Sequence, residues 1–174
     1  GKQQVLATVM TGSVFAPAGA LQVSAADMGR WLQLQLRHGA LDDGKRVFSE
    51  AASKALWAPQ TLIPIRQAPT PIALAQPQFS AYALGLEVQD YRGHKIVTHL
   101  GGVLGGISAV VIIPEKHAAF AIMVNSADIC TLFAISAHLL DSLLGLPSPD
   151  WINNYKQVFD QINAGARAAL KASN

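Results

Sequence analysis

Apolar residues recur at helical spacing in the first third of the chain. Ser24 is followed three residues later by Asp27, which is the arrangement of a helix N-cap with an acidic partner, and apolar side chains then repeat every three or four residues up to Gly39. A second, shorter helix is predicted to begin after Ser49 and to stop before Pro59. The first third of the chain is therefore expected to be mainly helical.

Helical spacing returns near the end of the chain. Either Ser126 or Asp128 is expected to cap a helix that ends at Gly145, and Asp150 is expected to cap a last helix. Its larger apolar residues form one stripe: Trp151, Tyr155, Phe159 and Ile162. Such a stripe is more typical of packing against the rest of a protein than of a cofactor site.

Between these helices the pattern is that of strands. Four are predicted, over residues 82–88, 95–99, 107–113 and 119–124. Their connections are too short for a crossover, so neighbouring strands must be antiparallel. The last two strands are apolar on both faces, which requires other elements to cover both sides of the sheet. The predicted fold class is therefore α+β, an antiparallel sheet covered by helices.

Two segments fit neither pattern. Residues 5–16 are apolar and β-branched, and they end at a loop beginning with Pro17. Residues 61–80 contain four prolines, each without a backbone donor, and are predicted to form a long irregular loop. Such a loop is either an edge of a binding site or a simple connector, and the sequence leaves both open.

Composition narrows the range of functions. The chain has 174 residues, 51% of them apolar and 14% charged, which indicates one folded domain. A net charge of +2 without a basic cluster argues against a nucleic-acid partner. The most apolar stretch, residues 129–146, is short for a membrane span and contains His138 and Asp141, so no transmembrane segment is expected. Cys130, the single cysteine, is expected to be a buried apolar residue rather than a catalytic thiol.

Candidate chemistry is concentrated in residues 99–106, where His99 and Leu100 are followed by two pairs of glycines. A phosphate-binding loop would have to lead into a helix, whereas these glycines lead into a predicted strand. A metal site is not expected, because no two histidines are four residues apart on a helix. Two interpretations remain. The segment is either a strand that carries His-x-Gly beside a catalytic cleft, or a glycine-rich strand corner with a surface histidine.

Several short motifs, in order, resemble those of the serine β-lactamase-like hydrolases, which include class C β-lactamases, penicillin-binding DD-peptidases, family VIII esterases and D-aminopeptidases. The matching segments are Ala16-Pro17-Ala18-Gly19-Ala20-Leu21 with the following Ser24 to Trp31, Tyr82-Ala83-Leu84-Gly85-Leu86, His99-Leu100-Gly101-Gly102, Val124-Asn125-Ser126, and Leu144-Gly145-Leu146-Pro147 with Asp150-Trp151. The resemblance implies a partial β-lactamase/transpeptidase-like fold. It divides the chain into a helical and loop part (1–80), antiparallel strands with a C-terminal helix (81–146), and a connector with a helical tail (147–174).

Two motifs of that family are missing from the chain. No serine has a lysine three residues later, and no tyrosine begins Tyr-x-Asn or Tyr-x-Ser. Both motifs precede the matching segments in the family, so the resemblance implies the C-terminal portion of a serine hydrolase that acts on ester or amide bonds. This chain alone, without the nucleophile, is expected to be inactive. A non-catalytic domain with a binding or structural role is the alternative.

The resemblance also implies roles for individual residues. The backbone N–H of Gly102 would be one of two oxyanion donors, next to Gly101 in the His-x-Gly motif, and His99 would line the pocket and orient the missing tyrosine or the substrate. Asn125 would contact the substrate. No cofactor is implied. The partners would be a small-molecule or peptide substrate and either the missing N-terminal half or another copy of the chain. The sequence leaves the location open, and the resemblance points to the periplasm or to secretion.

Overall fold

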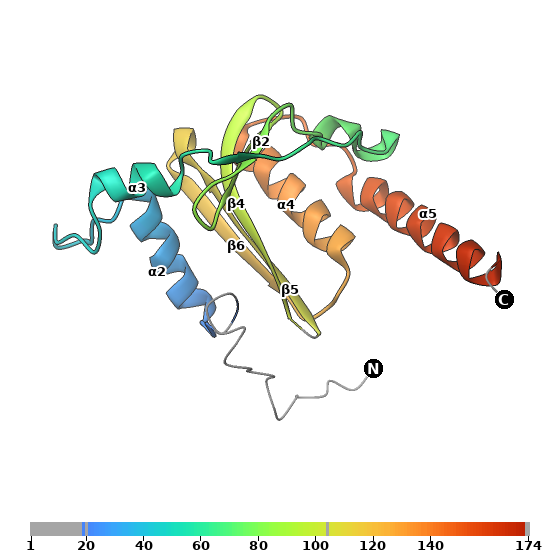
Figure 1. Ribbon diagram of the computed structural model, residues 1–174, viewed down its shortest axis with the longest axis horizontal. Helices are drawn as coiled ribbons and strands as arrows, with labels where there is room; N and C mark the ends of the chain where they lie inside the picture. Colours follow the sequence, from blue (N-terminus) through green and yellow to red (C-terminus); the bar gives the residue numbers. More distant parts are fainter. Residues whose placement is uncertain (1–18, 20, 104, 173–174) are drawn as a thin grey trace.

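The computed structural model describes residue 19, residues 21–103 and residues 105–172. The apolar segment at residues 5–16 lies outside the described residues. Helices flank one sheet (Figure 1). They are α2 (Ala25–Leu36), α3 (Glu50–Leu56), α4 (Ile129–Leu144) and α5 (Trp151–Ala172), with two short 3₁₀ helices, η1 (Thr70–Ala75) and η2 (Pro114–Lys116).

The sheet is antiparallel, as the short connections predict, and its six strands lie in chain order. They are β1 (Thr61–Leu62), β2 (Ser80–Tyr82), β3 (Glu87–Tyr91), β4 (His94–Val103), β5 (Gly106–Ile113) and β6 (Ala118–Val124). Arg92 and Gly93, which join β3 to β4, both have positive φ angles (52° and 86°). Two consecutive residues of this kind make the tight turn whose twist matches that of the flanking strands. The predicted α+β class is confirmed.

Two strand predictions were wrong in their bounds. The segment 82–88 was predicted as one strand, whereas the chain turns inside it: the N–H of Ala83 donates to the carbonyl of Leu86 at 2.7 Å, and Gly85 has a φ of 81°. The second predicted strand, 95–99, is longer and continues through the glycine pair to Val103. The predicted loop at 61–80 is irregular except for β1 and η1.

The predicted helix caps are confirmed. Ser24 accepts a hydrogen bond from the backbone N–H of Asp27 at 3.2 Å and donates to its carboxylate at 2.7 Å. Of the two candidates before α4, it is Asp128 that caps the helix, since its carboxylate accepts from the N–H groups of Cys130 and Thr131. Gly145 ends α4 in the left-handed conformation that glycine favours.

The two faces of the sheet carry two separate hydrophobic cores. On one face Val111 and Ile113 pack with residues of α4 and with Tyr155 of α5. On the opposite face Val97 and Ile112 pack with Leu32 of α2 and with Trp57, which follows α3. Figure 1 shows α2 and α4 on opposite sides of the sheet, as the apolar strands require.

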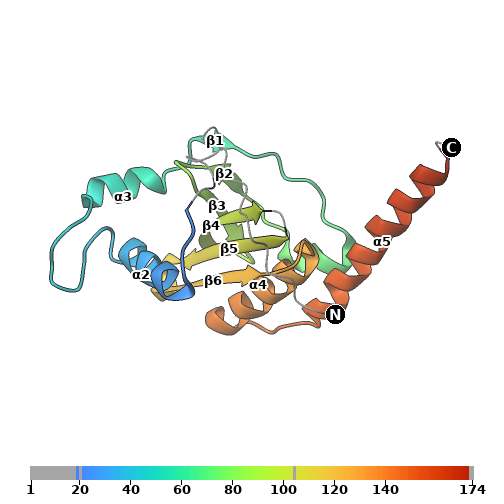
Figure 2. The same cartoon turned by 90° about the horizontal axis from the view of Figure 1, so that it is seen from below.

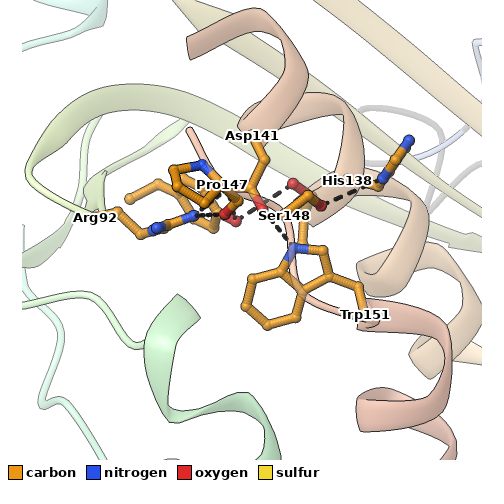
Figure 3. Close-up of polar contacts among 8 residues, drawn as sticks. Arg92, His138, Asp141, Pro147, Ser148 and Trp151 are labelled. Carbon is orange, nitrogen blue, oxygen red and sulfur yellow. Dashed lines mark hydrogen bonds and ion pairs between the residues drawn. The ribbon is translucent and has the colours of Figure 1, made fainter. Parts of the chain in front are cut away.

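A buried polar cluster fixes the link from α4 to α5 (Figure 3). The Asp141 carboxylate is fully buried and accepts three hydrogen bonds: from the Tyr91 hydroxyl (2.8 Å), the Arg92 guanidinium (2.7 Å) and the Trp151 indole N–H (2.6 Å). Arg92 also donates to the carbonyl of Pro147 at 2.8 Å. The turn between β3 and β4, helix α4 and the start of α5 are therefore held together by one carboxylate.

Among the described residues, the buried side chains of α5 lie in its first half. Trp151, Tyr155 and Val158 are buried, whereas Ile162 is 61% exposed and Leu170 is 67% exposed. Figure 2 shows the second half of α5 extending away from the sheet. The predicted stripe therefore serves in packing at its beginning and is open to solvent further along.

Candidate functional site

Strand β4 carries the predicted site residues past the end of its neighbour. Strand β3 begins at Glu87, which pairs with Thr98, so the part of β4 from His99 onward pairs with β5 alone. His99, Gly101 and Gly102 are all in this one-sided stretch and are all exposed. Side chains alternate along a strand, so His99 and Gly101 lie on the same face as Val97, the face that α2 covers.

The backbone of Gly102 points toward the side that β3 leaves open. A two-residue turn joins Tyr91 to His94, so these two residues exchange hydrogen bonds, and every second residue of β4 after His94 directs its N–H and C=O toward β3. Gly102 is one of these residues, and it lies four positions past Thr98, the last residue of β4 that β3 reaches. Within the described residues, no strand takes up its N–H.

A side chain at Gly101 would meet the side chain opposite it on β5. A Cβ atom at this position would lie 2.4 Å from the hydroxyl oxygen of Ser108, its partner in β5. At Gly102 a Cβ atom would meet nothing within 4 Å. The two adjacent glycines therefore differ: an added Cβ atom would meet the Ser108 hydroxyl at the first and no described atom at the second.

The imidazole of His99 lies next to the phenol of Tyr82. Its Nε2 is 3.4 Å from the Tyr82 hydroxyl, and the two rings meet edge to face, with centroids 6.4 Å apart and planes inclined by 61°. Tyr82 ends β2, two strands away from β4. Sequence reasoning assigned no role to Tyr82, although it is the first residue of a segment that resembles a family motif.

Asn125 lies at the same end of the sheet but is not brought into contact with the other three predicted residues. It follows Val124, which pairs with Ile107, and Ile107 in turn pairs with Gly102. Strand β5 therefore separates Asn125 from Gly102. Among the described residues no hydrogen bond links Asn125 to His99.

Other candidate chemistry is weaker. No group of His, Cys, Asp and Glu side chains in the described part of the chain is arranged to hold a metal ion. Cys130 is buried, as predicted, and its burial, together with the charge of Asp128, raises the pKa of its thiol. Among the described residues, no helix has the length and apolar character needed to cross a membrane.

A pocket of about 290 Å³ lies on the other face of the sheet. Side chains of β4, α4 and α5 line it, and residues of the proline-rich segment border it: Arg66, Ala68, Ile72, Ala75, Gln76 and Pro77. Residues 66–77 of this segment therefore border a pocket. His99, Gly101 and Gly102 do not line this pocket, so it is separate from the candidate site.

Comparison with known proteins places the chain in a family. The family model described as Beta-lactamase matches residues 1–135. The chain belongs to the beta-lactamase family. It is 27% identical over 156 residues to the unguisins hydrolase ungD' of Aspergillus campestris (strain IBT 28561), and 28% identical over 166 residues to the unguisins hydrolase ungD of Aspergillus violaceofuscus (strain CBS 115571).

The beta-lactamase match covers all four predicted site residues and all six strands. The two alignments cover 88% and 84% of this chain but only 27% of each relative. The chain therefore spans about a quarter of the length of these curated relatives. No solved structure matches the chain. Membership of the beta-lactamase family indicates a function of the serine hydrolase type.

Proposed function

We propose that this chain is the C-terminal portion of a serine hydrolase that cleaves ester or amide bonds through an acyl-enzyme, with the nucleophile supplied by a segment that this chain lacks. The observation that carries the proposal is the backbone of Gly102, whose N–H points to the open side of β4 beyond the last residue paired with β3. A free, fixed N–H at a strand edge is the kind of donor that stabilises an oxyanion. Family membership supplies the reaction type.

In the proposed reaction the serine Oγ bonds to the substrate carbonyl carbon, and the carbonyl oxygen becomes an oxyanion that accepts a hydrogen bond from Gly102. The oxyanion then collapses, the bond to the alcohol or amine breaks, and the leaving group takes the proton that the serine gave up. Water hydrolyses the resulting ester and regenerates the serine. His99 lines the same side and orients substrate, and Asn125 is proposed as a more distant substrate contact.

The proposed substrates are esters or D-amino-acid peptides before penicillins. Penicillin-recognising members of the family often have lysine where this chain has His99. A neutral imidazole is a weaker counter-ion than an ammonium group for the carboxylate of a β-lactam. Both curated relatives are named unguisins hydrolases, which agrees with hydrolysis as the reaction.

Among the described residues, one edge of the sheet has no neighbouring strand, which supports the proposed partner, either the missing N-terminal half or a second copy of the chain. Strand β6 is last in the order, and none of its seven residues is charged or a proline. Ala119 and Ala121 of β6 pack in the same core as Leu32 of α2, a groove of about 420 Å³ lies between the two elements, and Met123 is 46% exposed. Unprotected apolar edges of this kind pair with other chains. Light scattering is expected to detect a dimer or larger species for this chain alone, and a monodisperse monomer with a sharp melt would contradict this.

The test of the proposed function is labelling with a fluorescent fluorophosphonate and with a fluorescent penicillin. The chain alone is expected to take up neither label and not to hydrolyse nitrocefin or p-nitrophenyl esters above background. The complete parent protein is expected to be labelled once per molecule by the fluorophosphonate, at a serine outside this chain. Stoichiometric labelling of a serine within this chain would overturn the proposal. A parent protein that takes no label and hydrolyses no ester or amide would instead favour the non-catalytic alternative.

A further inference from the structure

We infer that Tyr82 is a positioning residue for His99: its hydroxyl donates a hydrogen bond to Nε2, holds the imidazole in the Nδ1–H tautomer, and so makes Nδ1–H the donor that the ring offers to substrate. The role in the reaction rests on the proposed function, whereas the contact and the tautomer do not. Tyr82 acts through His99 and is not itself a catalytic residue.

The geometry of the pair points to a directed contact. The hydroxyl oxygen and Nε2 are 3.4 Å apart, and the rings are inclined edge to face at 61°. This separation is long for a hydrogen bond, and such contacts at active sites shorten when substrate excludes water. Among the described residues, no other hydrogen bond is made by the Tyr82 hydroxyl or by either ring nitrogen of His99.

The backbone of Tyr82 is held on both sides, so the phenol has a fixed origin. Tyr82 pairs with Thr61 of β1 and with Glu87 of β3, and its carbonyl accepts the N–H of Gln60 at 2.9 Å. The side chain remains 41% exposed, so the phenol lies at the surface beside His99 rather than in the core. A residue that is rigid in its backbone and accessible in its side chain is suited to orient a neighbouring exposed ring.

The direction that we infer for the hydrogen bond rests on the chemistry of the two groups. A neutral imidazole has one N–H and one lone pair, and the partner of one nitrogen sets which of the two carries the proton. A phenol O–H is a good donor, and the atom of His99 that it faces is Nε2. Donation to the Nε2 lone pair leaves the proton on Nδ1. The opposite arrangement, Nε2–H donating to the phenol oxygen, would give the other tautomer.

Nuclear magnetic resonance of the full 174-residue chain decides between them. With ¹⁵N-labelled histidine, His99 is expected to be mainly the Nδ1–H tautomer in the parent sequence and mainly the Nε2–H tautomer in Tyr82→Phe, which keeps the ring and removes the hydroxyl. His94 on the same strand is the control, because its Nδ1 contacts Glu115 at 2.6 Å and Tyr82 does not reach it. An unchanged His99 tautomer in Tyr82→Phe, or Nε2–H as the main form in the parent sequence, would overturn the inference.

Kinetics in the complete parent protein test the role. Tyr82→Phe is expected to lower kcat/KM by about tenfold or less, the effect of one hydrogen bond between neutral groups, and to add no further loss in His99→Ala. Independent, multiplicative losses in the double variant would show that Tyr82 does not act through His99 and would overturn the positioning role. A parent without hydrolase activity would contradict the proposed function, and the tautomer measurement would still decide for or against the contact.

Discussion

Replacement of Asp141 by asparagine is expected to destabilise the protein strongly, although it changes one atom. The Asp141 carboxylate is fully buried, and both of its oxygens act as hydrogen-bond acceptors. Oδ1 accepts from the Tyr91 hydroxyl and the Arg92 guanidinium, and Oδ2 accepts from the Trp151 indole N–H. An asparagine has one oxygen and one NH₂ group. If the NH₂ replaces Oδ2 it faces the Trp151 N–H, and if it replaces Oδ1 it faces Arg92. Either orientation places donor against donor.

The size of the effect follows from the charge that is removed. The side chain of Arg92 is only 15% exposed, so solvent compensates little for the loss of its ion pair. Removal of one partner from a buried ion pair typically costs about 3–5 kcal/mol. The asparagine retains one acceptor, so about 3 kcal/mol is expected. This is a large fraction of the roughly 5–15 kcal/mol by which native proteins are stable.

The measurement is urea denaturation followed by circular dichroism, with the free energy of unfolding compared between variants. Asp160→Asn is the matched control: Asp160 also pairs with a cation, Lys156, but its side chain is 58% exposed. The control is expected to change stability by less than about 0.5 kcal/mol. Equal effects of the two substitutions, or a loss below about 0.5 kcal/mol for Asp141→Asn, would refute the view that the buried carboxylate holds α4 and α5 to the β3–β4 turn.

Three further outcomes are expected. Burial raises the pKa of Tyr155 to about 12, above its ordinary value of 10.0. This hydroxyl therefore contributes stability below pH 10 that is lost as pH rises toward 12. In urea titrations between pH 9 and pH 11, the free energy of unfolding should fall by about 1 kcal/mol less in Tyr155→Phe than in the parent. Gly101→Ala should lower the melting temperature, and Ser108→Ala should restore it, since the added Cβ meets the Ser108 hydroxyl. Gly102→Val should raise stability by about 0.5–1 kcal/mol, because its Cβ enters open space and valine favours a strand, yet should slow acylation in the complete parent protein.

Local chemistry explains why much of the fold was predictable. Ser24 and Asp128 mark helix starts because a short polar side chain can accept from free backbone N–H groups, and this requirement is visible in a few residues. The chain reversal between Tyr82 and Glu87 was missed because residues 82–88 are mostly apolar and strand-like. The left-handed Gly85 was the one signal of a turn within them.

The site was predictable in position and not in its contacts. His99 and the glycines were identified because imidazole and bare backbone have specific uses. The approach of Tyr82 depends on the register of β2, β3 and β4, which is set by strand pairing across intervening turns and leaves no local trace in the sequence. The Asp141 cluster was missed for a related reason: its donors come from residues 91, 92 and 151, far apart along the chain.

The adjacent glycines separate structural need from a requirement of the site. At Gly101 an added Cβ atom would require the Ser108 hydroxyl to move, so the fold supplies a packing contact at this position. At Gly102 the φ angle is not positive and a Cβ atom would meet no atom of the described residues within 4 Å, so neither backbone strain nor packing within this part of the chain requires glycine. Glycine in a strand interior also costs stability, roughly 0.5–1 kcal/mol relative to alanine. A glycine that weakens its strand without a structural reason is best explained by a ligand that must approach the backbone there. The N–H of Gly102 faces the side of β4 where β3 has ended, which is where such a ligand would approach.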